Sequence, residues 1–318
     1  MQTWTGLDGL RSLPRGLALS IGNFDGIHKG HQRILDVARS HGQPLAVVTF
    51  EPHPLTVLRP HLAPPRLTPL QLKRRLLEQL GVDHLVILPP QPEVLNLSAE
   101  AFWQILRDEV QPACLVEGES FSFGKNRGGS VQKLREWSAT TPIQLHGVPP
   151  VQVVLIDLSI VQVSSSLIRW LISNGRARDA AICLGRPYTL EGLVGRGFQR
   201  GRTIGFPTAN LHCGDQMIPA DGVYAARCTV DNRLYPAALS IGTMPTFGAN
   251  RRQIEAHLIG FDGDLYDTIL QVELLDWLRD QVKYPSVDAL LVQMRKDIDT
   301  TLALFQTDPA RPIAATVL

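Results

Sequence analysis

Short apolar segments alternate with amphipathic segments along the first half of the chain. The apolar segments, which have the length of buried strands, are LALSI, PLAVVTF, HLVIL, ACLVEG and IQLHGV. Between them, apolar side chains recur at helical spacing in residues 69–81, 99–110 and 130–138. This alternation predicts an α/β domain with a parallel sheet covered by helices, in which ligands bind beyond the carboxyl ends of the strands.

The pattern changes from about Tyr188. The later segments are short and strand-like, and Gly, Pro, Asp and Asn separate them: GVYAARCTV, LYPAALSIG, IEAHLIGF and ILQVELLD. Because there is little helix between them, they predict an antiparallel sheet or a small β-barrel. Residues 287–305 have one apolar face, and we expect this helix to pack on the barrel. The sequence therefore predicts two domains, residues 1–184 and 185–318.

Composition limits the classes of partner. Of the 318 residues, 44% are hydrophobic and 19% are charged, as is usual for a soluble globular protein. Lysine and arginine total 31 against 30 acidic residues, so the overall charge favours neither nucleic acid nor a membrane surface. We expect small-molecule partners, with no nucleic-acid and no membrane partner. The sequence leaves the oligomeric state open.

The cysteines and the start of the chain bear on the cellular compartment. The four cysteines are far apart and form no metal-type or redox-type motif: Cys114, Cys183, Cys213 and Cys228. The N-terminal stretch lacks the unbroken apolar region of a signal peptide, and no apolar run approaches the length of a membrane-spanning helix. These features predict a cytoplasmic protein.

The stretch SIGNFDGIHKGHQRIL places His28 and His31 between glycines, after a strand-like run and before a helix-like one. The free N–H groups and the positive dipole end at a helix start favour an anion such as phosphate. Gly22 and Gly26 would let the backbone approach such a ligand closely. A zinc site would need further ligands, and the sequence has no HExxH or CxxC spacing here. A glycine-rich turn whose histidines face solvent is the plainer alternative.

Two further segments suit phosphate groups. In VSSSLIRWLI, Ser164, Ser165 and Arg169 open a helical pattern, where such hydroxyls either cap the helix or meet a phosphate beside the arginine fork. In GRGFQRGRTIGFPTANL, the glycines can bring backbone amides to phosphate oxygens. Thr208 and Asn210 at its end offer oxygen ligands suited to Mg²⁺. Taken alone, each segment is equally compatible with a structural role.

A carboxylate lies within RRQIEAHLIGF, where apolar residues alternate with Glu255 and His257. A carboxylate on a barrel strand is usually solvated. If Glu255 instead faces the glycine-rich loop, it can take the proton of an attacking alcohol, as a positioned carboxylate does in kinases. The alternation alone does not decide the direction of this side chain.

Together, these segments resemble the prokaryotic bifunctional riboflavin kinase/FAD synthetase family over nearly the whole chain. The matching segments, in the family's order, are GNFDGIHKGH, VTFEPHP, GESFSFG, SSSLIR, LGRPY, GRTIGFPTANL, DGVYAA, SIGTMPTF and IEAHLIGFDGDLY. The resemblance implies a Rossmann-like α/β nucleotidyltransferase domain, followed by an antiparallel β-barrel flavokinase domain with a C-terminal helix.

The resemblance also implies two reactions. The C-terminal domain would transfer the γ-phosphate of ATP to the ribityl 5′-hydroxyl of riboflavin, giving FMN. The N-terminal domain would transfer AMP from a second ATP to FMN, giving FAD and pyrophosphate. Riboflavin, FMN and FAD are then substrates and products rather than prosthetic groups, and Mg²⁺ accompanies ATP.

The family's site residues carry over position by position. In the N-terminal domain the resemblance implies nucleotide contacts from Gly22, Asn23, Phe24, Gly26, His28, His31, Ser164, Ser165 and Arg169. It also implies that His28 and His31 are catalytic. In the kinase domain it implies nucleotide contacts from Gly201, Gly205, Thr208 and Asn210. Thr208 and Asn210 would also bind Mg²⁺, and Glu255 would be the general base. Phe121 and Phe123 are the candidates for the flavin side.

Ser120 departs from the family pattern, which usually carries Asp or Asn at this position. One alternative is therefore a riboflavin kinase whose N-terminal domain binds nucleotide but transfers little or no AMP. A second alternative is a non-catalytic sensor of flavin or nucleotide. The presence of Glu255 argues against a sensor, because a binding protein needs no general base.

Overall fold

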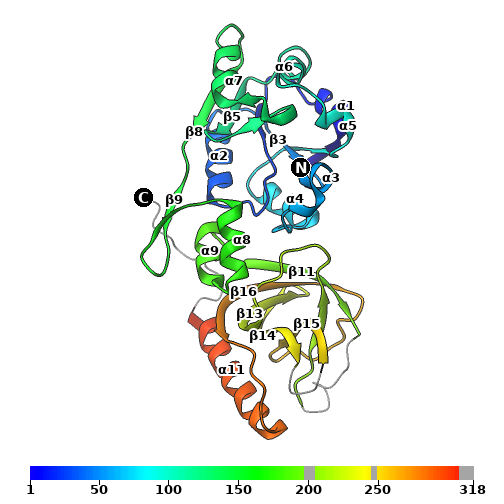
Figure 1. Ribbon diagram of the computed structural model, residues 1–318, viewed down its shortest axis with the longest axis vertical. Coiled ribbons are helices and arrows are strands. Elements are labelled where there is room, and N and C mark those ends of the chain that lie inside the picture. The colour runs from blue at the N-terminus through cyan, green and yellow to red at the C-terminus, as the bar shows by residue number, and fades with distance from the viewer. Residues whose placement is uncertain (197–204, 245–248, 308–318) are drawn as a thin grey trace. The chain divides into compact units, whose positions relative to one another are not determined.

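The computed structural model describes residues 1–196, 205–244 and 249–307. The chain folds into two compact units, Met1–Gln152 and Val153–Leu318. The first unit is an α/β unit, and the second contains a β-barrel (Figure 1). Both parts of the predicted fold class are confirmed.

A six-stranded parallel sheet forms the centre of the first unit, in the order β1-β4-β3-β2-β5-β8. Its strands are β1 (Gln2–Thr5), β2 (Ala18–Ile21), β3 (Leu45–Phe50), β4 (His84–Leu88), β5 (Cys114–Gly118) and β8 (Gln144–Val148). The helices are α1 (Gly6–Arg11), α2 (Lys29–Ser40), α3 (Leu55–Leu58), α4 (Leu70–Gln79), α5 (Pro92–Leu95), α6 (Ala99–Gln104) and α7 (Val131–Ser138). A π-helical turn, Ile105–Val110, continues α6, and a small hairpin pairs β6 (Ser122–Phe123) with β7 (Gly129–Ser130).

The strand order reverses at β2. From β2 the chain adds β3 and β4 on one side of the sheet, then β5 and β8 on the other. In sheets of this kind the crevice at such a switch point, beyond the carboxyl ends of the strands, binds the ligand. The GNFDGIHKGH loop follows β2, so the sheet places it at this crevice.

Helices cover both faces of the sheet. Val48 on β3 points into a core that includes Leu10 of α1. The adjacent Val47 points into a second core, which includes Leu35 of α2 and Leu77 of α4. Because both faces of the central strands are buried, these strands have the uninterrupted apolar sequences from which the parallel sheet was predicted.

The first residues of the chain form a strand that the hydrophobic pattern did not predict. β1 pairs in parallel with β4 at one edge of the sheet, with Gln2 opposite His84. The sequence QTWT has a single large apolar side chain, because an edge strand buries less surface than a central one. Because β1 is mostly polar, the pattern of apolar residues did not predict it.

The second unit contains a closed antiparallel barrel with the strand order β11-β12-β15-β14-β13-β16. Its strands are β11 (Tyr188–Gly195), β12 (Ala209–His212), β13 (Gly222–Val230), β14 (Arg233–Met244), β15 (Ala249–Leu258) and β16 (Ile269–Arg279). The C-terminal helix α11 (Val287–Thr307) packs against β13, β14 and β16, as predicted. Arg279 of β16 forms an ion pair with the buried Asp297 of α11, with 2.8 Å between Nη2 and Oδ2.

Two helices and a small hairpin precede the barrel within the second unit. The hairpin pairs β9 (Gln152–Val154) with β10 (Ile160–Gln162), and the helices are α8 (Ser165–Ser173) and α9 (Ala177–Leu184). The two helices are separate because Gly175, with a φ of 72°, ends α8. α9 packs against β11 and β16 of the barrel. These contacts group residues 153–184 with the barrel in one compact unit.

Candidate active sites

The loop between β2 and α2 carries the first group of predicted residues. Gly22 is needed for close packing, since a Cβ there would lie 3.3 Å from the Phe24 ring. Gly26 has a φ of 89°, in the left-handed region that favours glycine. The Phe24 side chain is only 1% exposed and belongs to the core of the first unit, so its backbone is the part available to a ligand.

His28 is the N-cap of α2, a role that the sequence did not reveal. Its Nδ1 accepts a hydrogen bond from the backbone N–H of His31 at 3.3 Å. Because Nδ1 is the acceptor, the neutral ring carries its proton on Nε2, which is then a donor. The two imidazoles stack, with 3.7 Å between ring centroids, and His31 also contacts Phe24. The loop therefore brings both predicted histidines together at the start of one helix.

A second strand end meets the start of this loop. The Glu117 carboxylate on β5 accepts a hydrogen bond from the backbone N–H of Ile21 at 2.7 Å. Glu117 is only 2% exposed, and burial raises the pKa of its carboxyl well above its usual range despite this hydrogen bond. Sequence reasoning missed Glu117. The usable signal was an acidic residue inside the otherwise apolar strand CLVEG.

The turn after β5 holds the predicted flavin-side residues. Ser120 is exposed in this turn. Phe121 is half-buried and stacks on Phe123 with 5.5 Å between ring centroids. Phe123 is buried and also contacts Phe102 and Trp137, so the hydrophobic core of the first unit supports the stacked pair. Phe121 is the more accessible of the two rings.

The predicted residues Ser164, Ser165 and Arg169 lie at the start of α8, in the second compact unit. Ser164 is the N-cap of this helix, and its Oγ accepts from the backbone N–H of Leu167 at 3.2 Å. Ser165 and Arg169 are half-buried on the first turn and a half. The segment therefore offers a capped helix start with an arginine nearby, an arrangement that suits a phosphate.

In the barrel, strand register brings Glu255 and Asn210 together. Asn210 of β12 lies directly opposite Glu255 of β15 in an antiparallel pair, so both side chains point to the same face. Thr208 precedes β12, and its hydroxyl donates to Glu255 Oε2 at 3.3 Å. The structure thus brings Glu255 to Thr208 and Asn210, which precede it by more than forty positions in the sequence.

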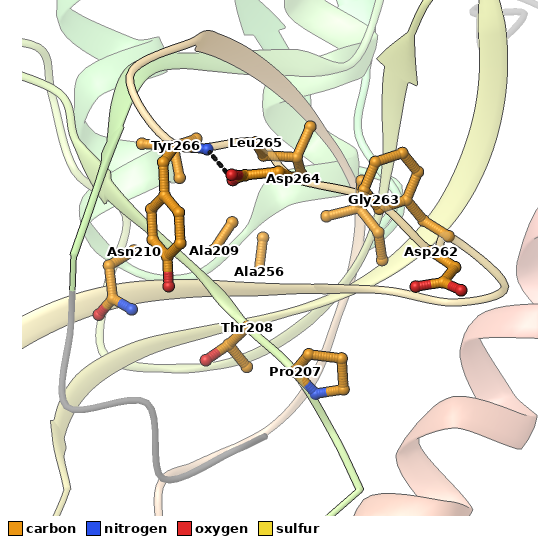
Figure 2. Close-up of a pocket in the computed structure, with 13 residues that line it drawn as sticks. Pro207, Thr208, Ala209, Asn210, Ala256, Asp262, Gly263, Asp264, Leu265 and Tyr266 are labelled. Atoms are coloured by element: carbon orange, nitrogen blue, oxygen red, sulfur yellow. Dashed lines mark hydrogen bonds between the residues drawn. The ribbon is translucent and has the colours of Figure 1, made fainter.

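A pocket of about 440 Å³ lies beside this cluster. Its lining residues are Val194, Pro207, Thr208, Ala209, Asn210, Ala256, Leu258, Phe261, Asp262, Gly263, Asp264, Leu265 and Tyr266. In Figure 2, Tyr266 and Asn210 lie on one side of the view, and Pro207 and Asp262 lie on the other. The loop from Phe261 to Tyr266 was recognised as part of a matching segment, but sequence reasoning assigned it no place in a site.

The remaining kinase residues divide between described and undescribed parts of the chain. Gly205 is exposed and has a φ of 85°, in the left-handed region. Gly201 lies outside the described residues.

Burial sets the proton affinity of the Glu255 carboxyl. Glu255 is half-buried, and burial raises its pKa above the usual range, while the Thr208 hydroxyl partly offsets the shift. A raised pKa makes the carboxylate a stronger base than an exposed glutamate. Glu255 does not line the pocket itself, but Thr208, which donates to it, and Asn210, which lies opposite it, both do.

Two family models match consecutive parts of the chain. The model described as FAD synthetase matches residues 10–165, and the model described as riboflavin kinase matches residues 184–305. The chain belongs to the bifunctional riboflavin kinase/FAD synthetase family. The family predicted from the sequence motifs is confirmed.

Curated relatives match this family member over nearly its whole length. The bifunctional riboflavin kinase/FMN adenylyltransferase of Escherichia coli K12 is 33% identical, over 98% of this chain and 100% of that protein. The Bacillus subtilis protein of the same name is 34% identical, over 90% of this chain and 92% of that protein. Among solved structures, the macrolide-efflux protein from Streptococcus pneumoniae has a TM-score of 0.82 and 30% identity, over 95% of this chain and 99% of that one. None of the helices in the described part of this family member has the length and apolar character needed to cross a membrane.

Proposed function

We propose that this chain phosphorylates riboflavin to FMN in its C-terminal barrel and transfers AMP to FMN in its N-terminal domain, residues 1–184, with ATP as the donor in both steps. The observation that carries the proposal is the presence of both sites in one chain. One is a loop at a sheet switch point with His28 at a helix start; the other is a barrel pocket with Glu255 opposite Asn210. We place the functional boundary between residues 184 and 185, next to residue 184, where the riboflavin kinase match begins.

In the kinase step, Glu255 accepts the proton of the ribityl 5′-hydroxyl while the oxygen of that hydroxyl attacks the γ-phosphorus of ATP. An alcohol is a weak nucleophile near neutral pH, so a positioned base contributes directly to the rate. The raised pKa of the Glu255 carboxyl supports this role. The proton is transferred to the carboxylate of Glu255, the bond between the γ-phosphorus and the bridging oxygen breaks, and ADP is released.

We propose that Thr208 and Asn210 would hold Mg²⁺ in the kinase site. The hydroxyl of Thr208 and the amide oxygen of Asn210 are hard ligands of the kind that Mg²⁺ prefers, and both residues line the pocket. When bound, the ion neutralises negative charge on the ATP phosphates. Residues of the chain then hold the nucleotide, while Glu255 accepts the proton of the ribityl hydroxyl. Gly201 and Gly205 are proposed to contact the same nucleotide through their backbone.

In the adenylylation step, the FMN phosphate is already a competent nucleophile and needs no base. The N-terminal site therefore has to position the two reactants and stabilise charge on the α-phosphate and the departing pyrophosphate. We assign this to the backbone of Gly22–Gly26, to the start of α2, and to the donor Nε2–H of His28 with its neighbour His31. Ser164, Ser165 and Arg169 are proposed as the second phosphate-contacting segment, and Phe121, backed by Phe123, as the flavin contact.

The pH dependence of the kinase step follows from the raised pKa of Glu255. The base must be ionised, so the rate falls as the pH drops through this pKa. The acid limb of the kinase profile should therefore lie at a higher pH than the pKa of an exposed glutamate side chain. Thr208→Val removes the hydroxyl that lowers this pKa, so we expect its acid limb at higher pH than that of Thr208→Ser. If the acid limbs of Thr208→Val and Thr208→Ser lie at the same pH, the Thr208 hydroxyl does not lower the pKa of Glu255.

The proposed function is tested by two incubations of the purified chain with ATP and Mg²⁺, one starting from riboflavin and one from FMN. Chromatography of the flavins should show FMN followed by FAD in the first, and FAD in the second. Chelation of Mg²⁺ should stop both reactions, and added Mg²⁺ should restore them. FMN that accumulates without FAD in both incubations would favour the alternative in which Ser120 marks an inactive N-terminal site. Absence of turnover with either flavin would favour a sensor.

We also propose a cytoplasmic location. None of the four cysteines, all of which lie in the described part of the chain, forms a disulfide, and Cys114, Cys183 and Cys228 are buried, as fits a reducing compartment.

A further inference from the structure

A buried lysine lies beneath the loop that follows β2. Lys73 of α4 is only 3% exposed, whereas the next two residues of the helix, Arg74 and Arg75, are half-buried and exposed, respectively. Its Nζ donates a hydrogen bond to the backbone carbonyl oxygen of Asn23 at 3.0 Å. A lysine is rarely buried without a specific partner, because removing its charge from water is costly. The contact with Asn23 is therefore a specific feature of this site.

Acidic side chains balance the buried charge. Nζ of Lys73 lies 3.4 Å from Glu51 Oε2, and Glu51 Oε1 in turn pairs with Arg66 Nη2 at 2.8 Å. Burial lowers the pKa of Lys73, and the negative charges of Glu51 and Asp25 oppose this shift. The acidic partners thus favour a charged ammonium beneath the loop.

The loop above Lys73 has an unfavourable backbone conformation. Phe24 and Ile27 have φ values of 44° and 43°, which non-glycine residues adopt rarely. Such conformations persist only where the surroundings hold them. The loop must therefore be held from outside its own sequence.

Side chains from three other segments hold this loop. The Asp25 carboxylate accepts from the backbone N–H groups of Leu67 and Thr68, and Thr68 Oγ1 accepts from the N–H of Gly26 at 3.0 Å. Thr49 Oγ1 of β3 donates to the Asn23 carbonyl at 3.0 Å, the same oxygen that Lys73 contacts. The Asn23 carbonyl therefore receives two donors, one neutral and one cationic.

The direction of this carbonyl matters for a phosphate site. A carbonyl oxygen carries partial negative charge and repels an anion, whereas backbone N–H groups attract one. By binding the Asn23 carbonyl on the buried side, Lys73 keeps that oxygen away from the phosphate side of the loop. Its positive charge lies under the same loop and adds to the favourable potential there.

We propose that Lys73 is a positioning residue of the adenylyl-transfer site, which acts through the Asn23 carbonyl to fix the phosphate-binding loop. The inference rests on the proposed function of the N-terminal unit. Lys73 need not touch the substrate. Its removal should alter how ATP is held, because misplacement of a binding loop by about 1 Å can reduce a rate roughly 10²-fold.

The test compares Lys73→Met, Lys73→Gln and Thr49→Val with the unmodified chain in FAD formation from FMN. For Lys73→Met we expect kcat/KM for ATP to fall by roughly 10²-fold, with a raised KM for ATP and an unchanged KM for FMN. Lys73→Gln keeps a hydrogen-bond donor without the charge, so its loss should be smaller. Thr49→Val leaves Lys73 on the carbonyl, so its loss should be the smallest. Lys133→Met, at a lysine of α7 whose side chain is 45% exposed, should match the unmodified chain.

The pattern of kinetic constants separates positioning from loss of structure. A partly unfolded variant has fewer active molecules, so its kcat falls while both KM values stay the same. If Lys73→Met does not fold, the same comparison is made with Lys73→Gln. A folded Lys73 variant with the KM for ATP and kcat of the unmodified chain would overturn the inference alone. If the unmodified chain makes no FAD from FMN, the proposed function fails first and the inference fails with it.

Discussion

Replacement of Glu255 by Gln is expected to lower FMN formation from riboflavin by roughly 10²–10⁴-fold, the usual contribution of a general base. The amide keeps the size of the side chain, and it can still accept from Thr208, but it cannot take a proton from the ribityl hydroxyl. FAD formation from supplied FMN should be unchanged, since that nucleophile needs no base. The two rates are measured on the same sample by chromatography of the flavins.

A matched control for this variant is Glu191→Gln on β11. Glu191 is another half-buried carboxylate of the barrel, and it accepts from Gln271 Nε2 at 2.8 Å rather than facing Asn210. We expect its kinase rate to stay within a few-fold of the unmodified chain. Loss of both activities in a folded Glu255→Gln variant would contradict the division of labour between the two units. An unchanged kinase rate would show that Glu255 is not the base.

The second large effect is expected at His28. His28→Ala should lower FAD formation from FMN by roughly 10²–10³-fold, as removal of one donor to a charged transition state does in other enzymes. The same change removes the N-cap of α2, which should destabilise the first unit by about 0.5–2 kcal/mol. Rate and thermal unfolding are therefore both measured, and FMN formation from riboflavin should be unaffected.

His28→Asn separates the two roles of this residue. Asparagine is a good N-cap, so the variant should keep most of the stability that His28→Ala loses. It lacks the imidazole Nε2–H, so its rate of FAD formation should be as low as that of His28→Ala. If His28→Asn restores the rate along with the stability, His28 acts as a cap and not as a phosphate contact.

The sequence was most informative where a pattern is local. Strands such as HLVIL follow from a short run of apolar residues, and the helix at residues 287–305 follows from apolar residues at helical spacing. The position of the GNFDGIHKGH loop after a buried strand was enough to place it at the ligand-binding edge of a sheet. For the same reason, the polar strand β1 was missed, since it departs from the local apolar pattern.

The contacts within the sites depend on pairings that no local pattern contains. The direction of Glu255 was undecided from alternation alone, and it follows only from the register that sets Asn210 opposite it. Lys73 contacts a carbonyl fifty positions earlier, and Glu117 contacts a backbone N–H on a neighbouring strand. A lysine and a glutamate on otherwise apolar faces were the visible signals. Their partners required the sheet order, which the sequence pattern does not give.

The short strand β1 also changes the character of one outer edge of the parallel sheet. A parallel sheet, unlike a closed barrel, leaves unpaired backbone groups at its two outer strands, where another chain can add. β1 covers β4, whose sequence HLVIL is strongly apolar, and presents the sequence QTWT at the outside of the sheet instead. The outer strand of the sheet is therefore the mostly polar β1 rather than the apolar β4. The barrel needs no such cover, because its strands form a closed sheet without edge strands.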